Sequence, residues 1–549
     1  MTADTLSKPA TKAVKPEGFR QAMAWLHTWA GLLFGWVLFA MFLTGTLAFF
    51  RPEISAWMTP EVKVAPISAV QSVELATRYL NNNAAGASRW YITPSTARAP
   101  AVLVSYVDPK AKPGRGSFKS ARIDPNTGEA IVARATRGGD FFYRFHYELE
   151  IGYPWGRWLA SVAGMFMLIA IISGIVTHKK IFSDFFTFRP GKGGQRAWMD
   201  GHNVLSVLGL PFHLMITFTG IILFMTMLMP AGMLAVYDNQ RAFINELYPA
   251  FAETPAANRA VPLAPIGDMV QAAQASWQGA NVGRIIINHP GDAAATVSIS
   301  GDVADRVSYG RLPPAMTFDG TTGARTSVTE DDNALRTTVG TMIGLHLGIF
   351  AQPLLRWLYF LTSLAGTAMV GTGLLLWVAK RRQKAGKDAA QRFSLRLVDG
   401  LNAGTIAGIL IATPAFFWAN RLIDPLQAGR SQLEIRMFFI AWGVAFVYAF
   451  LRRTTAWRDL LAVSSVMFLL IPVVNAVMTS RNLVASLAQG DWIFAGFDLT
   501  CIAAGLLLLW MTLKAARATQ RAHATLINAR LAQSRSQAAN PGLAANATR

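Results

Sequence analysis

Eight apolar stretches, each close to the length that crosses a lipid bilayer, constrain this chain more than any other feature. A helix needs about 20 mostly apolar residues to span the hydrocarbon core. The stretches, of which the sixth is the shortest, lie near residues 25–50, 155–178, 203–230, 353–379, 397–419, 435–451, 459–479 and 492–513. With 52% hydrophobic and 15% charged residues and a mean hydropathy of +0.32, the chain is predicted to be a polytopic α-helical membrane protein.

The net charge of +20 gathers in short segments between the apolar stretches. Lys and Arg mark cytoplasmic loops, so this charge predicts orientation and argues against nucleic-acid binding. Basic clusters precede the first stretch and follow the second, fourth, sixth and eighth, and all five fall on one side if there are eight spans. We therefore expect both termini in the cytoplasm. The first stretch lacks a small-residue cleavage site and is expected to be a retained signal anchor.

Several kinds of chemistry are absent from the sequence. Cys501 is the single cysteine, which excludes an intrachain disulfide, a CxxC pair and a cysteine-held iron–sulfur cluster. There is no HExxH, GxSxG, Walker loop, or GxGxxG after a strand. We therefore find no sign of a nucleotide or flavin bound by the chain itself.

Two long polar segments, 51–145 and 231–340, are predicted to lie outside the membrane opposite the cytoplasm, each as a small α+β module. The first is predicted to have a helix over 68–80, strands over 90–92, 101–107 and 129–133, and a turn over 124–128. The second is predicted to have a helix over 266–277, strands over 284–288 and 295–300, and a turn over 319–323. Both turns run Asp-x-x-x-Gly.

Histidines repeat with glycines at matching intervals. His27 precedes Gly45 by 18 residues and His202 precedes Gly220 by 18, with a threonine before each glycine. His146 precedes Gly174 by 28 residues, and His346 precedes Gly373 by 27. The pattern predicts a tandem duplication of span, module and span, with a pseudo-twofold axis along the membrane normal, followed by four further helices.

These assignments divide the chain as follows. The first half is predicted to have a cytoplasmic tail at 1–22, a span at 23–50, a module at 51–145, and a second span with its preceding interfacial segment at 146–178. After a cytoplasmic loop at 179–201, the second half repeats this order with a span at 202–230, a module at 231–340, and a span with its preceding interfacial segment at 341–379. A cytoplasmic loop at 380–396, four more spans over 397–513 and a basic cytoplasmic tail at 514–549 complete the prediction.

Several motifs occur in a fixed order along the chain. They are Leu26-His27-x-Trp29-x-Gly31, Phe141-Phe142-x-x-Phe145-His146, the Asp-x-x-Thr-Gly turns, and the segment 182–198 leading to Asp200-Gly201-His202. In these motifs the chain resembles the PepSY-associated transmembrane helix proteins, which include bacterial siderophore-iron reductases and iron-regulated membrane proteins. The resemblance covers roughly residues 20–385 and implies PepSY-like modules and a place in the bacterial inner membrane.

Six histidines lie at or near the first four spans, where an imidazole is costly to bury. They are His27, His146, His178, His202, His213 and His346. For any one of them, an ordinary place at the wet interface is an equally good explanation. A place at the interface is a weaker explanation for the repeat-related histidines as a set. They would lie on helices of one bundle, and bundle cores are where facing helices build cofactor sites.

Haem b suits this set better than a bare metal, because carboxylates are nearly absent from the first four spans. We predict two haems, one held by His146 and His346 at the outer face and one by His27 and His202 at the cytoplasmic face. His178 and His213 remain rival ligands or supporting partners.

Other residues have two readings each. Arg157 and Arg356 are predicted to hold haem propionates, although a lipid-headgroup anchor explains them equally well. Five glycines also have two explanations of equal weight: they would let helices approach the face of the haem, or they would serve only the packing of helices against one another. These are Gly31, Gly35, Gly164, Gly366 and Gly371.

The preferred hypothesis is a transmembrane electron conduit. By resemblance, electrons would pass from the cytoplasmic side to a ferric siderophore or other Fe(III) chelate outside, so the chain would be a reductase. The donor, a quinol, a cytoplasmic reductase or a flavoprotein, stays open, as does the role of the last four helices. The expected partners are thus membrane lipid, the chelate and this donor.

Two other hypotheses remain. A metal or siderophore permease would use the histidines as transient ligands, and its spans should be broken near mid-membrane. Spans one to four are mostly continuous in pattern, with Pro211 and Pro230 as exceptions. A binding or regulatory protein would explain the polar modules but not the histidine repeat.

Overall fold

The computed structural model describes residues 18–108, 118–178, 194–247, 255–329, 334–386 and 392–539. The N-terminal tail before residue 18, most of the 182–198 motif and the last ten residues lie outside these ranges, so their predicted roles have no structural counterpart below.

Within the described ranges, seven helices are long and apolar enough to cross a membrane. The chain is therefore a polytopic helical membrane protein, as predicted. The helices are α1 (Phe19–Ala48), α5 (Trp155–Thr177), α14 (Pro353–Ala385), the continuous stretch Phe393–Leu422, α17 (Arg430–Leu451), α18 (Ala456–Met478) and the part Trp492–Arg517 of α20 (Trp492–Ala539).

The third predicted span is broken. Helix α7 (Gly194–Leu208) meets α8 (Leu210–Ile222) at an angle of 70°, and the pair makes an eighth span only if both parts count as one. Gly209 separates the two helices and Pro211 lies in the first turn of α8. Proline lacks an amide hydrogen and its ring clashes with the preceding turn, so the helix restarts here in a new direction. The break thus lies beside Pro211, one of the two exceptions to a continuous pattern that the sequence analysis named in this span.

The end of the third span was also placed too late. Helix α8 stops at Ile222, and three short helices follow in place of the predicted continuation to residue 230. These are α9 (Met225–Leu228), α10 (Pro230–Leu234) and α11 (Gln240–Leu247).

The two polar segments form one antiparallel sheet instead of two separate modules. Its seven strands have the order β3-β2-β1-β4-β5-β6-β7. The strands are β1 (Arg89–Thr93), β2 (Val102–Val107), β3 (Phe118–Ile123), β4 (Val282–Asn288), β5 (Thr296–Gly301), β6 (Ala315–Asp319) and β7 (Arg325–Thr329). The first strands of the two segments join them, since β1 pairs with β4 through Trp90↔Ile287 and Ile92↔Ile285.

Helices cover one face of this sheet. Helices α3 (Ala69–Asn83) and α12 (Ile266–Ser276) pack on an apolar layer that includes Ile92, Val104 and Ile285. Helix α3 begins at a capping box in which Ser68 accepts from the amide of Gln71. Both helices lie where the sequence predicted them, and so do both turns, each closed by a left-handed glycine, Gly128 or Gly323.

One predicted strand is wrong and three were missed. Segment 129–133 makes only an isolated bridge between Ile123 and Ala130. The strands that the sequence did not predict are β3, β6 and β7. Strand β7 is exposed at nearly every position, so it lacks the apolar alternation that reveals a half-buried strand.

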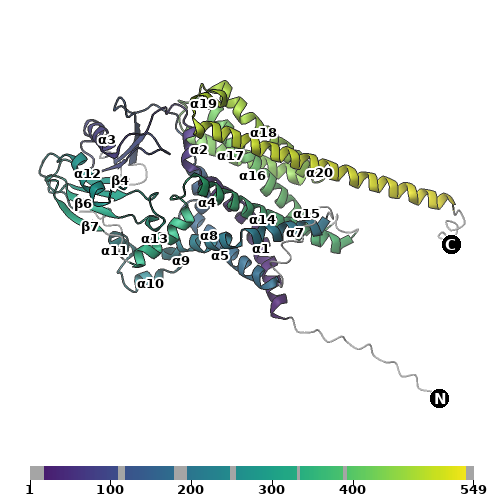
Figure 1. Cartoon of the computed structure of the whole chain (residues 1–549). Coiled ribbons are helices and arrows are strands. Elements are labelled where there is room, and N and C mark those ends of the chain that lie inside the picture. Colours follow the sequence, from purple (N-terminus) through teal and green to yellow (C-terminus); the bar gives the residue numbers. More distant parts are fainter. Residues whose placement is uncertain are drawn as a thin grey trace, which may run out of the picture.

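Short helices join the sheet to the membrane helices. Helix α4 (Asp140–Glu148) precedes α5, and α13 (Ala334–Leu347) precedes α14. Figure 1 shows the sheet at one end of the molecule, with the start of α1 and the end of α20 on the side away from it. We call these two ends the sheet side and the far side.

The last four spanning helices dock on the first part of the chain through a short helix, α2 (Arg51–Trp57). The buried Trp57 donates its indole N–H to Asp498 at 3.0 Å and lies under the guanidinium of Arg421 at 3.6 Å. Residues 403–407 form a π-helical turn between α15 (Phe393–Asn402) and α16 (Gly408–Leu422).

Candidate functional site

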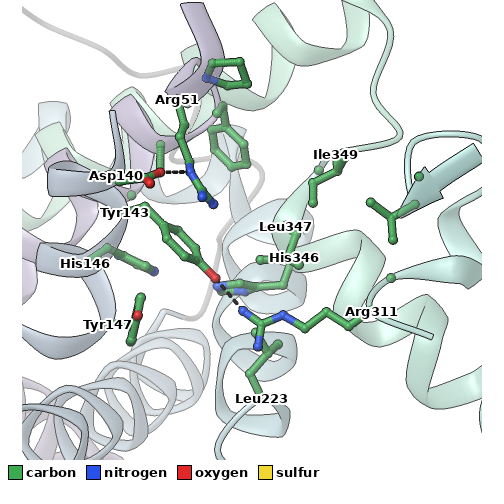
Figure 2. Close-up of a pocket in the computed structure, with 18 of the residues that line it drawn as sticks. Arg51, Asp140, Tyr143, His146, Tyr147, Leu223, Arg311, His346, Leu347 and Ile349 are labelled. Carbon is green, nitrogen blue, oxygen red and sulfur yellow. Dashed lines mark hydrogen bonds and ion pairs between the residues drawn. The ribbon is translucent and has the colours of Figure 1, made fainter. Parts of the chain in front are cut away.

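Two histidines meet on the sheet side. His146 is in the last turn of α4 and His346 is in the last turn of α13. Their ring centres lie 6.0 Å apart with 27° between the ring planes. Figure 2 shows the two imidazoles pointing toward each other from separate elements. We call these two residues the outer pair.

A second pair of histidines meets toward the far side. His27 of α1 and His202 of α7 have ring centres 6.2 Å apart and planes inclined by 66°. We call them the inner pair. His27 and Gly45 are 18 residues apart on the continuous helix α1, which corresponds to about 27 Å along its axis. Since Gly45 contacts His146, the two pairs lie near opposite ends of α1.

The separation of the rings has a simple chemical meaning. Metal–imidazole bonds of about 2 Å on both sides of one ion, together with the radius of each ring, put the ring centres about 6 Å apart. Each pair is thus spaced to ligate one metal ion from opposite sides. Within the described ranges, no three His, Cys, Asp or Glu side chains are placed to share an ion.

All four rings are held in the same tautomer. Each Nδ1 lies within hydrogen-bond distance of a backbone carbonyl, which can only accept, so Nδ1 carries the proton and Nε2 keeps its lone pair. The distances are 2.7 Å from His27 to Ala170, 2.7 Å from His146 to Met41, 2.9 Å from His202 to Met369 and 2.8 Å from His346 to Ile216.

Each of these carbonyls lies four residues before a glycine that the imidazole covers. A methyl group on Gly45 would come 2.6 Å from His146, and one on Gly220 would come 2.7 Å from His346. On the inner pair, Gly174 and Gly373 would come 3.1 and 3.2 Å from His27 and His202. The sequence showed these glycines as part of the repeat, but not that each receives a histidine from another helix.

A hydroxyl before each glycine donates to the same carbonyl. Thr44 bonds Met41 at 3.2 Å and Ser173 bonds Ala170 at 3.2 Å. Thr219 and Thr372 bond Ile216 and Met369 in the same way. A hydroxyl–glycine dipeptide therefore lies beneath each of the four imidazoles, and Ser173 and Thr372 are members of this set that the sequence analysis did not identify.

The other two histidines are placed differently. Nε2 of His213 lies 3.3 Å from the carbonyl of Thr362, and its buried Nδ1 finds no hydrogen-bond partner in the part of the chain that the structure describes. His213 packs against Gly209 and Gly366. His178 ends α5 as an exposed residue. Neither has a ring contact with another histidine among the described residues.

The five glycines predicted to face a haem are not those that the paired imidazoles cover. Gly35 meets Leu374, Gly371 meets Phe39 and Gly164 meets Ile221, so these three serve contacts between helices. Gly366 lies against Phe42 and His213, and Gly31 has open space around it.

The two predicted arginines differ in their surroundings. Arg157 lines the cavity beside the outer pair, where Nε lies 3.5 Å from Glu148 and the guanidinium stacks over Tyr147 and Tyr153. Arg356 is away from that cavity, 3.2 Å from Glu53 and 2.7 Å from the carbonyl of Ala351. Of these two arginines, Arg157 alone therefore borders the cavity, where its charge is paired with Glu148.

The outer pair opens into a cavity of about 1200 Å³ that extends to the sheet. Burial lowers the pKa of His146, and burial together with the neighbouring His146 lowers the pKa of His346 to about 3. Both imidazoles are therefore neutral at physiological pH, as a metal ligand must be.

The comparisons with known proteins place the two pairs inside one matched region. The family described as PepSY-associated TM region matches residues 24–380. The uncharacterized protein PA4219 of Pseudomonas aeruginosa is 28% identical over 408 residues, covering 69% of this chain and 95% of that protein. All four paired histidines lie within 24–380, and the last four helices follow it.

Proposed function

This chain belongs to the PepSY-associated TM region family, and from that membership and the two imidazole pairs we propose that it is a di-haem b electron-transfer protein. It moves electrons across the bacterial inner membrane to a ferric siderophore or another Fe(III) chelate, and so acts as a reductase. The observation that carries the proposal is the spacing of about 6 Å within each pair.

The residues fit this cofactor in three respects. Two imidazoles meet at each site, and together they would hold the iron of a haem. The carbonyl-bound Nδ1 atoms keep each Nε2 free to ligate. The glycines under the rings leave space that any other side chain would occupy. His146 and His346 hold the outer haem, His27 and His202 hold the inner one, and Arg157 binds a propionate.

A bound haem supplies a one-electron Fe(III)/Fe(II) couple. The chain positions one such group near each end of α1, so charge has a route through the hydrocarbon layer, which is about 30 Å thick. Arriving at the cavity, the electron reduces the ferric ion of the chelate. Fe(II) is bound less tightly by hard oxygen donors, so iron is released.

The orientation follows from the basic residues. Lys380, Arg381 and Arg382 lie at the end of α14 on the far side, away from the sheet. We place the far side and both termini in the cytoplasm, with eight spans if α7 and α8 count as one. The first four spans and the two halves of the sheet arise from a duplication. The donor, a quinol, a cytoplasmic reductase or a flavoprotein, meets the inner pair.

The visible spectrum of the purified protein tests the proposal. We expect a Soret band, reducible haem and about two haems per chain. His346→Ala should lose the outer haem and abolish reduction of external chelate, whereas His289→Ala, at a partly buried histidine outside the cavity lining, should change neither. A colourless protein from iron-replete cells, or an unchanged haem content in the His346 variant, would refute the proposal.

A metal or siderophore permease is the second candidate, and the 70° break between α7 and α8 favours it. Broken helices form the central sites of many transporters. This function requires uptake of the chelate into sealed vesicles without any reductant. The conduit instead requires reduction without uptake, so one vesicle assay distinguishes the two.

A further inference from the structure

We propose that the cavity between the sheet and the outer pair selects ferric chelates of net negative charge, and that Arg122, Arg284 and Arg311 recognise them. This rests on the proposed function, because it names the class of chelate which that function leaves open. The argument comes from the placement and pairing of the charges around the cavity.

The sheet forms one wall of the cavity with the face that α3 and α12 leave uncovered. Directly paired residues of antiparallel strands point to the same face. Arg122 of β3 pairs with Leu103, Leu103 pairs with Thr93, and Arg284 of β4 pairs with Ser300. All five line the cavity. Each half of the sheet thus directs one arginine toward the same space.

The charges on the wall are unbalanced. Among the described residues, eight arginines line the cavity, against two aspartates and no glutamate or lysine. One of the eight, Arg336, donates to the carbonyls of Leu312 and Pro313. Four of the arginines are neutralised: Arg51 by Asp140, Arg98 by Glu53, Arg157 by Glu148 and Arg481 by Asp491. Among the described residues, Arg122, Arg284 and Arg311 form no ion pair with a carboxylate.

Of these three, Arg122 is partly buried, whereas Arg284 and Arg311 are exposed. An unpaired guanidinium in a partly buried place is costly, and an anionic ligand offsets that cost for Arg122. Burial lowers the pKa of Arg122, which reflects this penalty, although the group stays charged. Arg311 reaches across to donate to the hydroxyl of Tyr143, and Figure 2 shows this contact beside His346. Arg51 covers the ring of Tyr143 at 4.7 Å. The positive charge therefore extends to the outer pair.

The remaining wall suits a ligand covered with oxygen atoms. Hydroxyls of Thr93, Thr317 and Thr329 line the same cavity and can donate to such a ligand, whereas the Ser300 hydroxyl donates to the carbonyl of Arg284. The cavity volume of about 1200 Å³ includes the space beside His146 and His346, which the proposed outer haem would share. An oxygen-rich and anionic chelate matches the donors and the charge of the remaining wall.

Binding of gallium(III) chelates tests this inference, because gallium(III) is redox-inert and its binding does not depend on electron transfer. We would measure by titration calorimetry the affinity of the full-length protein for a trianionic tris-catecholate complex and for an uncharged tris-hydroxamate complex. At low salt we expect the trianionic complex to bind at least about tenfold more tightly, with the difference shrinking as salt screens the arginines.

The double variant Arg122→Gln/Arg284→Gln should reduce that preference by about tenfold and leave the haem spectrum unchanged. Arg325→Gln, on the same sheet but off the cavity wall, should keep the preference. Equal affinity for the two chelates, or an undiminished preference in the double variant, overturns the inference. A colourless protein that still prefers the trianionic complex supports the charged site and refutes only the electron-transfer function.

Discussion

At the scale of single residues, each paired imidazole depends on a glycine of a different helix. The ring reaches a carbonyl of that helix only because no side chain stands between them, as with His346, Gly220 and the carbonyl of Ile216. The glycine thus helps to set the direction in which Nε2 points, although it would not itself contact a metal bound there. Outer groups of this kind commonly change metal affinity 10–100-fold when they are altered.

We therefore predict that Gly220→Ala weakens retention of the outer haem by about 10–100-fold, because its methyl group would press on the ring of His346. The inner haem should stay, so the haem content should fall from about two to about one per chain. Pyridine-haemochrome analysis and a redox titration measure this. Gly443→Ala is the matched control, since its methyl group would meet no atom within 4 Å. Equal haem content in both variants would contradict the role given to Gly220.

At the scale of elements, the apolar stretches predicted the spanning helices well, because burying a backbone in lipid leaves few alternatives to a helix. The repeat also indicated which histidines would meet. The sequence could not show that β1 pairs with β4, because strands pair through backbone groups, and these do not specify which strand will be the partner. In the sequence, only Pro211 indicated the break at Gly209. The imidazole–carbonyl contacts could not be predicted, because they depend on how the helices cross.

The turn between β6 and β7 provides a pH-dependent prediction. Asp319 accepts from the amides of Thr321 and Thr322 and from the Thr321 hydroxyl, which together lower its pKa to about 2. Because the pKa is depressed in the folded state, this stabilisation is complete above about pH 4 and is lost as the pH falls toward 2.

Asp319→Asn should therefore lower the melting temperature of the protein at pH 6 and flatten its dependence on acid. Thermal unfolding followed by circular dichroism between pH 6 and 3 would measure both effects. If the variant and the unaltered protein lose stability in parallel over that range, the carboxylate does not make the contribution described here.

At the scale of the whole molecule, the order of the two pairs gives the final prediction, since they lie near opposite ends of α1. In vesicles with the sheet side outward, an electron from an enclosed donor must pass the inner pair before it reaches the outer pair. His27→Ala should therefore abolish reduction of external chelate by the enclosed donor while the outer haem stays bound. A reductant added outside should still reduce that haem.

His346→Ala should also abolish reduction, but the inner haem should remain reducible from within. The haem spectra of the two variants, each recorded with the reductant on one side and then on the other, test this order. If His27→Ala vesicles still transfer electrons outward, the inner pair does not lie on the route, and a single centre in the outer half would have to account for the activity.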